Sequence, residues 1–431
     1  MLFIKKIAAV TLLCALAAAP ASAAQELKIE EAAALTLRNN LTLRSLREEI
    51  KKSEAFTLQA KGTRLPSVAL KATADRQREP QTNDGTDKSS SRSATATLEQ
   101  VLYSGGKNSA LLKQAPQQAT MAELAVAHGE NTAIGELYAR FYNVLLKKKQ
   151  IEAEEAAIKT SELHLAQVRR MAELGLANRL DVIRAGQQLA SNNAALATAQ
   201  GLFTAAEISL RSYITVDPAE PVTATGSLYI PTVSGDRASS LVLAEEYRAD
   251  RKRLEEQLGF RENQIQIEKS GLMPKVTAAL SSGWSNPYRN ADEGGDSWRA
   301  ELEIAVPIFD RNVTQSAVLT QKALREQDKI ALEQKNIDIK ADVETAWSDI
   351  ETTRKNFTAQ EKALELAKET LRLAEVGFRE GVTPQLDLLD AQSALTAAQL
   401  EYNRAQYNCV IAVAALKMTE GTIVSWNGGR R

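Results

Sequence analysis

The stretch MAELGLANRLDVIRAGQQL, residues 171–189, returns in altered form as GFREGVTPQLDLLDAQSAL, residues 377–395. The two stretches align without a gap, with Gly175 on Gly381 and Asp181 on Asp387. An internal repeat of this length indicates two copies of one structural unit. The repeat therefore decides the architecture, and every other motif is placed by its position within the unit.

Long helices are predicted on both sides of each repeated glycine. Residues 108–214 and 313–417 are rich in Ala, Leu, Gln, Glu and Lys, which favour helix. Apolar residues recur there at every seventh position, and their second-copy counterparts are apolar too. In the first copy they are Leu137, Val144, Ile151, Ile158, Leu165, Ala172, Val182, Leu189, Leu196, Phe203 and Leu210. A strict heptad predicts left-handed supercoiling. Because neighbouring seam positions are often polar, we expect a curved wall of helices rather than a dry two-stranded coil.

Two β-hairpins are predicted, at about residues 66–103 and 274–309, where apolar and polar residues alternate. Each strand has about ten residues, enough to cross a bilayer as a tilted barrel strand. The even, apolar positions are expected to face lipid. The odd positions carry the charged residues expected to line a water-filled lumen, which are Lys71, Asp75, Glu99, Arg299, Glu301 and Glu303.

Aromatic residues bracket these hairpins. Trp284 and Trp298 lie at the loop end of the second hairpin, and Tyr103 and Phe309 lie at the other end. Two such levels are typical of interface girdles, although aromatics can also cap a soluble sheet. Since four strands cannot close a barrel with a lumen, and lipid excludes open strand edges, the chain is expected to oligomerise. Three chains would give twelve strands.

A secretory signal is predicted at residues 1–23, with Lys5 and Lys6 before a short apolar run and Ala21-Ser22-Ala23 as the cleavage site. The residues before Cys14 lack the small residue of a lipoprotein site, so no lipid anchor is expected. Removal of the signal leaves Cys409 as the single cysteine, which excludes an internal disulfide.

Composition and motifs argue against several function classes. The chain has 53 basic and 54 acidic residues and a net charge of −1, so no nucleic-acid partner is expected. His128 and His164 have no Cys or His at ligand spacing, and we expect both on helix surfaces rather than at a metal. Phosphate loops and catalytic constellations are absent from the sequence, so neither a cofactor nor an enzyme activity is expected.

The whole mature chain resembles the TolC-like outer-membrane efflux channels. The resemblance rests on LKIEEAAALTLRNNLTLRSLREEI, LPSVALKA, EQVLYSGGK, VPIFDRN and the doubled G-[LV]-x-x-x-L-D-[VL]-[IL]. It implies a homotrimer with a twelve-stranded transmembrane barrel, four strands per chain, continuous with a long α-helical barrel in the periplasm. It also implies an exit duct for an inner-membrane efflux pump or ABC transporter and a periplasmic adaptor.

Five segments are expected along the chain. They are a signal peptide (1–23), a first repeat (24–214, turning near 175–181), a linker near the girth of the helical barrel (215–246), a second repeat (247–418, turning near 381–387) and a C-terminal tail (419–431).

The two helix turns are expected to form the periplasmic mouth. Gly175 and Gly381 would end one helix, while Asn178 and Thr383 would cap the next, with Pro384 as its first residue. By resemblance, the adaptor contact is assigned to Gly175, Leu176, Ala177, Gly381, Val382 and Thr383.

Acidic residues after each turn suggest a gate. Asp387 and Asp390 lie three apart on one helix face, and with Asp181 they match acidic gate positions of the family. The competing interpretation is that acids in a first turn merely complement the helix dipole. Some family members lock the mouth with an Arg after the second glycine, where this chain has Thr383; Arg179 or Arg184 is a substitute to test.

The competing function class is a soluble periplasmic coiled-coil adaptor, against which the doubled hairpins argue. The transported substrate cannot be read from the sequence.

Overall fold

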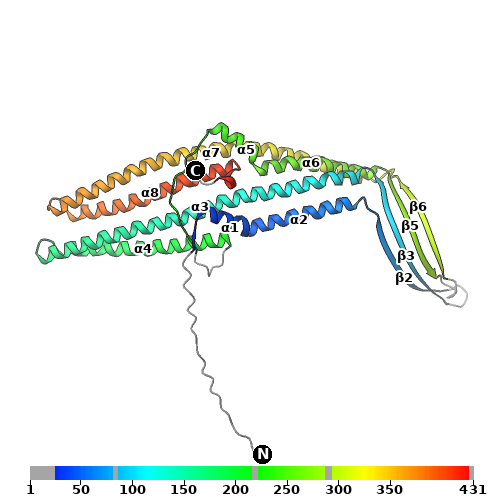
Figure 1. Ribbon diagram of the computed structural model, residues 1–431, viewed down its shortest axis with the longest axis horizontal. Coiled ribbons are helices and arrows are strands. Elements are labelled where there is room, and N and C mark those ends of the chain that lie inside the picture. The colour runs from blue at the N-terminus through cyan, green and yellow to red at the C-terminus, as the bar shows by residue number, and fades with distance from the viewer. Residues whose placement is uncertain (1–24, 81–85, 216–221, 287–293, 427–431) are drawn as a thin grey trace, which may run out of the picture.

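The computed structural model describes residues 25–80, 86–215, 222–286 and 294–426. The expected signal peptide therefore lies outside the described residues, as do parts of the expected linker and tail. A bundle of long helices forms the body, a four-stranded sheet extends from one end, and two helix turns form the other end (Figure 1). No helix within the described residues is both long and apolar enough to cross a membrane.

Two helices of 67 residues, α3 (Lys107–Glu173) and α7 (Val313–Arg379), run most of the length of the body. At about 1.5 Å per residue each is roughly 100 Å long. On the sheet side they pack with α2 (Leu41–Gly62) and α6 (Ala249–Lys269), and toward the tips with α4 (Arg179–Ile214) and α8 (Gln385–Thr419). From here on, the pair α3/α4 is called the first helical hairpin and the pair α7/α8 the second helical hairpin.

The heptad positions predicted from the sequence are covered along both helical hairpins, since none of them is exposed. Leu137 and Val144 on α3 are fully buried, as is Leu416 on α8. Cys409 is 1% exposed and packs as a small apolar residue on α8. These residues bury the seam between the members of each helical pair.

The main core lies at mid-length, around Phe141 on α3 and Ile214 at the end of α4. There β1 (Gln25–Leu27) pairs in parallel with β4 (Val222–Ala224), and α1 (Ile29–Asn39) packs against α3. The expected linker thus holds both β4 and α5 (Arg237–Tyr247), which the sequence alone did not place. Short turns η1 (Ser270–Leu272) and η2 (Ile423–Ser425) complete the fold.

The four strands of the extended sheet are antiparallel neighbours in the order β2-β3-β5-β6. They are β2 (Ser67–Pro80), β3 (Thr86–Ser104), β5 (Lys275–Asn286) and β6 (Gly295–Ala305). The sheet joins the two halves of the chain because β3 pairs directly with β5. Its outer strands, β2 and β6, each have one free edge in the described chain.

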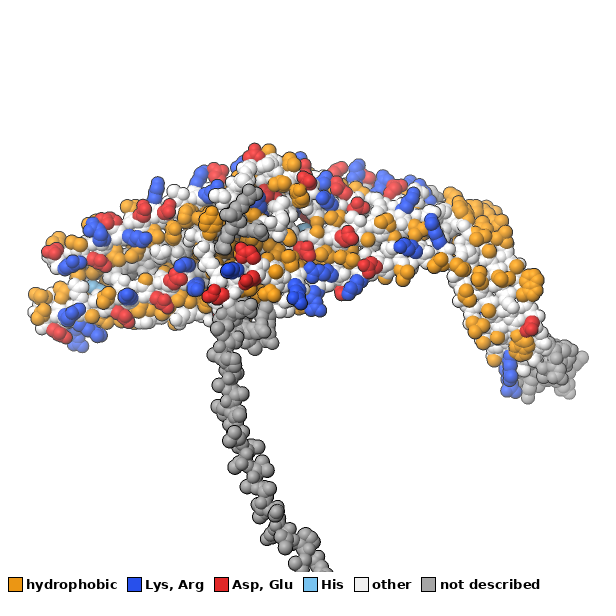
Figure 2. All heavy atoms as spheres, viewed as in Figure 1, with side chains coloured by type: hydrophobic (Ala, Val, Ile, Leu, Met, Phe, Trp, Pro, Cys, Tyr) orange, Lys and Arg blue, Asp and Glu red, His pale blue; other side chains and the backbone are white. Residues whose placement is uncertain are grey.

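Strand register gives the sheet one apolar face. Residues directly opposite in antiparallel strands share a face, and Val68, Leu98 and Leu280 form one such row. A register shift between Val101 and Tyr103 brings the odd-numbered Tyr103 opposite Val276, and therefore onto this face. In Figure 2 apolar side chains gather over the sheet, whereas charged side chains are spread over the helices. Trp298 is 76% exposed and Leu70 79% exposed, so a single chain leaves this face uncovered.

Candidate functional site at the helical tips

The first tip joins α3 to α4 through a turn closed by hydrogen bonds at both of its ends. Gly175 has a φ of +74°, its N–H donates to Ala172 O, and the next N–H, of Leu176, donates to Met171 O at 2.8 Å. This pattern ends a helix with a residue in the left-handed region, which favours glycine. Asn178 then caps α4 as predicted, because its Oδ1 accepts from the N–H of Asp181 at 3.0 Å and the Asp181 carboxylate accepts from Asn178 N–H at 3.1 Å.

The second tip, between α7 and α8, repeats this helix ending but not the cap. Gly381 has a φ of +75°, and the N–H of Val382 donates to Gly377 O at 2.8 Å. The prediction that Thr383 is the N-cap was wrong: Pro384 occupies the N-cap position, and α8 begins at Gln385. Thr383 instead lies over the last turn of α7, where its side chain fills the space beside Gly377.

The six residues expected to contact an adaptor all lie on these two turns, at the end opposite the sheet (Figure 1). Leu176 is 71% exposed and Val382 81% exposed, although both are apolar. Gly175 and Gly381 are exposed, and a Cβ added at either would meet no atom within 4 Å. Ala177 and Thr383 are half-buried. Each tip thus presents a small surface with one exposed large apolar residue.

Gln385, at the start of α8, connects the two tips. Its Nε2 donates to Asp181 O at 2.9 Å and lies 3.4 Å from Nε2 of His164 on α3. The side chain is buried, and its Oε1 accepts no hydrogen bond from the described residues. Four helices therefore meet at this amide, since the His164 ring also contacts Phe378 of α7, with ring centres 5.3 Å apart.

The expectation that His164 lies on a helix surface was wrong, because it is only 4% exposed. Burial lowers the pKa of this imidazole from its ordinary value. The neutral ring fits the contact with Gln385, since an imidazole nitrogen that faces an amide N–H has to be the acceptor. Protonation of His164 would place two N–H donors against each other.

The acidic residues expected at the gate differ in their surroundings. Asp387 and Asp390 are exposed on α8, while Leu388 and Leu389 between them are buried. Asp181 is half-buried and is used by the cap of α4. The predicted pair therefore projects from one side of the bundle, whereas Asp181 already has a structural role.

A row of glutamines separates the two helical hairpins, and sequence reasoning missed it. Gln385, Gln392 and Gln399 recur every seven residues on α8, where they face the first hairpin. Gln399 donates to Asn403, which in turn donates to Lys149 O of α3 at 3.4 Å. The signal was available in the sequence as a second heptad, parallel to the apolar one. The contact between the hairpins is thus polar at these positions near the tips, whereas at mid-length it is apolar, where Val410 and Ala414 of α8 join the core around Phe141.

The six charged residues expected in the lumen share one face of the sheet. Glu99 lies opposite Ala279, and Ala279 lies opposite Glu301. The same register places the others on this face through the pairs Ser67–Glu99, Lys71–Thr95, Asp75–Ser91, Thr277–Glu303 and Ser281–Arg299. All six are exposed. Their face is opposite to the one that carries Trp284 and Trp298.

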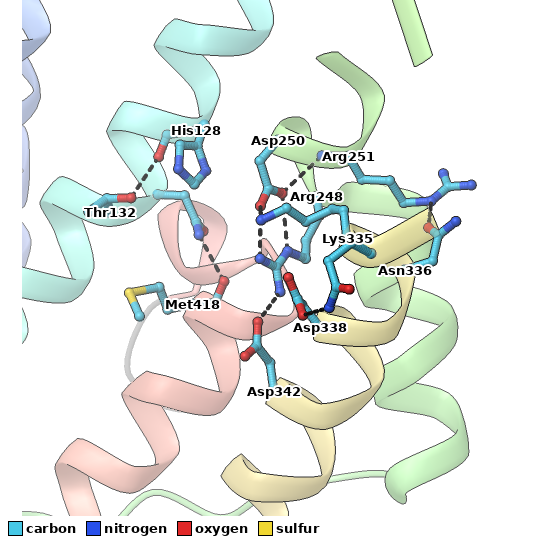
Figure 3. Close-up of polar contacts among 12 residues, drawn as sticks. His128, Thr132, Arg248, Asp250, Arg251, Lys335, Asn336, Asp338, Asp342 and Met418 are labelled. Carbon is cyan, nitrogen blue, oxygen red and sulfur yellow. Dashed lines mark hydrogen bonds and ion pairs between the residues drawn. The ribbon is translucent and has the colours of Figure 1, made fainter. Parts of the chain in front are cut away.

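A network of ion pairs fixes the helices at mid-length (Figure 3). Arg248, between α5 and α6, is 2.8 Å from Asp250 and 2.7 Å from Asp342 of α7, and Lys335 is 3.4 Å from Asp250. Burial alone would raise the pKa of Asp250, but the hydrogen bonds and charge of Arg248 hold it well below its usual range. His128, whose pKa is lowered mainly by burial, lies beside this network.

These features do not make a metal centre. No group of three or more His, Cys, Asp or Glu side chains within the described parts of the chain could hold a metal ion. The arrangement instead provides two exposed turns, exposed carboxylates just behind one of them, and polar contacts between the two helical hairpins near the tips.

Comparison with known proteins places this geometry in a family. A profile described as outer membrane efflux protein matches residues 32–215 and 243–422. Protein CyaE of Bordetella pertussis is 26% identical over 391 residues, which cover 88% of this chain and 81% of CyaE. The cobalt-zinc-cadmium resistance protein CzcC of Cupriavidus metallidurans is 22% identical over 392 residues, which cover 89% of this chain and 87% of CzcC.

Solved structures show the same fold. Crystal structures of CusC match with a TM-score of 0.79 at 18% identity, over 91% of both chains. The open state of the Neisseria gonorrhoeae MtrE outer membrane channel matches with a TM-score of 0.77 at 20% identity, over 92% of this chain and 89% of MtrE. The fold of the chain is therefore that of these outer membrane channels.

Proposed function

The chain belongs to the outer membrane efflux protein family, and from this premise we propose that it is the exit duct of a tripartite efflux or type I secretion system. Substrates would pass from an inner-membrane pump and a periplasmic adaptor to the exterior. The observation that carries the proposal is the family match across both halves of a chain whose sheet has one exposed apolar face and one charged face. A bilayer on one side and water on the other would satisfy both faces.

The proposed assembly is a homotrimer with a twelve-stranded barrel. Support comes from the free edges of β2 and β6, because unpaired backbone groups are excluded from lipid. A three-fold ring would pair each β2 with the β6 of a neighbour. Lys71, Asp75, Glu99, Arg299, Glu301 and Glu303 would then line the lumen.

The proposed gate is at Asp387 and Asp390. Both carboxylates are exposed in the single chain and lie just behind the second tip. In a three-fold ring they would form two layers of negative charge, which favour cations and repel anions. Asp181 is a weaker member of this gate because its carboxylate caps α4.

The proposed adaptor surface is formed by the two tips of each chain. Its support is the exposure of Leu176 and Val382 on turns whose backbone is fixed by hydrogen bonds. Exposed apolar side chains that are gathered at one end of an assembly are typical of a protein contact. With two tips per chain, a trimer would offer six such contacts.

The transported substrate is not identified by this proposal. Relatives of this chain are named for cobalt-zinc-cadmium resistance, for solvent efflux and for toluene efflux. Because such different names occur on one fold, we expect the pump rather than the duct to choose the substrate.

Deletion of the gene in its host tests the proposal, with the wild-type chain returned on a plasmid. We expect cells of the deletion strain to retain a compound that wild-type cells export. The plasmid-encoded protein should sediment with outer membranes and run as a trimer that survives mild detergent. The soluble adaptor alternative requires recovery in the periplasmic fraction, and such recovery would reject the proposal.

A further inference from the structure

The apolar face of the sheet ends in basic residues at the end farthest from the helical body. Arg76 on β2 and Arg92 on β3 are both exposed. Arg92 lies opposite Ala74 on one side and opposite Asn286 on the other. Since Trp284 is two residues from Asn286 on β5, Arg92 shares a face with that indole. Figure 2 shows Lys and Arg side chains at this end of the sheet, beyond the apolar ones.

The charge at this end of the face is positive. Arg78 and Lys88, which the register pairs one row farther out, belong to the same face by alternation. Among the described positions of this face the one acid is Asp296, which lies opposite Trp284 on β6. Four basic residues against one acid leave a surplus of three positive charges in each chain.

The two exposed arginines are placed to act on one anion. Arg76 lies opposite Ser90, two residues along β3 from Arg92, so the arginines are diagonal neighbours on one face. Such neighbours are about 7–8 Å apart, a gap that two long side chains can close. Neither guanidinium has an ion-pair partner among the described residues. Guanidinium groups bind phosphate through paired N–H donors.

The depth of these arginines follows from the length of β5. Val276 lies opposite Tyr103 and Asn286 opposite Arg92, so ten residues of β5 separate the two levels. At about 3.4 Å per residue and a tilt of about 40°, they span roughly 25 Å across the bilayer. The apolar band of an outer-membrane barrel is about 25 Å tall, and an arginine at its edge costs little. Arg92 therefore lies at the level of lipid headgroups.

These headgroups belong to the outer leaflet. The helical body extends from the opposite end of the sheet (Figure 1), and that body lies in the periplasm. The arginines are thus on the external side of the membrane. Below them the same face carries the exposed side chains of Leu70 and Leu280, which suit contact with acyl chains.

We propose that Arg76 and Arg92 bind the anionic phosphate of a lipid headgroup in the outer leaflet. The acyl chains of that lipid would lie against the apolar rows below. A lipid suits this surface better than free phosphate does, because positive charge and apolar surface adjoin on one face. A zwitterionic headgroup is disfavoured because its own cation offsets the phosphate charge. The inference rests on the proposed position of the sheet in the membrane.

Quenching of tryptophan fluorescence tests the site. Trp284 and Trp298 share the face of the arginines, whereas Trp347 and Trp426 lie in the helical body and give a constant background. The purified protein is reconstituted into phosphatidylcholine vesicles with rising fractions of phosphatidic acid whose acyl chains carry bromine, which quenches nearby indoles. A matched titration uses brominated phosphatidylcholine. For the wild type we expect a preference of about tenfold for phosphatidic acid.

Two double variants separate this surface from the general charge of the sheet. Arg76→Gln with Arg92→Gln removes both guanidinium groups and is expected to lose most of the preference. Lys71→Gln with Arg299→Gln removes the same charge from the opposite face and is expected to keep the wild-type preference. Each preference is a ratio of two titrations on one protein, so a change in the fluorescence of the protein itself cancels.

The possible outcomes are distinct. Equal affinity of the wild type for the two lipids, or an unchanged preference in the arginine variant, would overturn the proposal. Inorganic phosphate that abolishes the preference would assign the arginines to free phosphate and would overturn it too. If brominated phosphatidylcholine does not quench the wild type at all, the sheet does not meet lipid, and the proposed function is rejected as well.

Discussion

The side-chain amide of Gln385 donates from Nε2 to the main-chain oxygen of Asp181 at 2.9 Å, which fixes the first turn of α8 to the first turn of α4. This contact joins the two tips at the level where the resemblance led us to look for an Arg lock. Thr383 occupies the position of that Arg and packs on Gly377. Arg179 and Arg184, the substitutes considered from the sequence, are both exposed.

The first prediction follows from this amide. Gln385→Leu keeps an apolar body at the position but removes the donor to Asp181 O, at a cost of about 1 kcal/mol in folding free energy. We expect the hairpins to separate more readily and the closed channel to leak more current in planar bilayers. Gln334→Leu, on the exposed side of α7, is the control and should leave the conductance unchanged. A Gln385→Leu channel with wild-type conductance would show that this hydrogen bond does not keep the periplasmic end of the channel closed.

A second prediction concerns the exposed carboxylates. The double variant Asp387→Ala, Asp390→Ala removes both proposed layers of charge, so block by divalent or trivalent cations should weaken and leak conductance should rise. Block curves in planar bilayers measure the effect. Asp349→Ala, which removes an exposed acid on α7 far from the tips, controls for the loss of acidic charge elsewhere on the chain. Unchanged cation block in the double variant would support the helix-dipole interpretation instead.

A third prediction separates backbone strain from docking at the tips. Gly175→Ala and Gly381→Ala meet no neighbouring atom, so each should cost only about 1 kcal/mol, the strain of a positive φ. We expect these variants to support efflux. Gly175→Glu and Gly381→Glu have the same strain but add bulk and charge, so they should abolish efflux while trimers still form. Normal drug tolerance in the glutamate variants would show that the tips do not contact the adaptor.

A fourth prediction concerns the ion pairs at mid-length. Arg248 is 13% exposed and neutralises two carboxylates, so Arg248→Ala leaves Asp250 buried without its main partner and should cost about 3 kcal/mol. Arg372→Ala, which breaks an exposed pair with Glu369, should cost far less, because water screens an exposed pair. Thermal unfolding of the two variants makes the comparison. Similar losses in both would mean that the network contributes no more than a surface pair.

A fifth prediction is a pH dependence at the tips. Burial holds the pKa of His164 below its ordinary value, so the folded chain binds the proton less readily than the unfolded chain. The stability from neutral His164 is complete above the unfolded pKa of about 6.5, and it falls as pH drops below that value toward the lowered folded pKa.

Melting at about pH 7.5 and pH 5.5 tests the dependence. The wild type should lose more stability on acidification than His164→Leu does. His128, whose pKa is also lowered by burial, is present in both proteins, so its share cancels. An equal loss of stability in the two proteins would show that His164 does not contribute to the destabilisation by acid.

Periodicity made much of the fold predictable. The heptad that includes Leu165 and Leu210 identified the buried seams, because a residue that recurs every seven positions must return to the same helix face. Alternation likewise placed Glu99 and Glu301 on one side of their strands, and the register agrees. The heptad and the alternation can both be recognised in the sequence because each follows from the geometry of a single helix or strand.

The features that were missed depend on contacts between distant segments. His164 was expected on a surface because nothing near it in sequence shows that Gln385 and Phe378 cover it. The same applies to β4, whose partner β1 lies at the other end of the first repeat. Thr383 was predicted as an N-cap because its hydroxyl can accept from a helix N–H. The prediction did not consider Gly377, against which the Thr383 side chain packs instead.

The pairing of β3 with β5 has a consequence for the order in which the protein can be made. Ser104 lies opposite Lys275, and the whole of α3, α4, α5 and α6 is synthesised between them. The first β-hairpin therefore emerges long before its neighbour in the sheet exists, with Leu70 and Val68 uncovered. Strands that must wait for distant partners form slowly and aggregate while exposed, so the free edge of β3 is open to wrong pairing until β5 has been made.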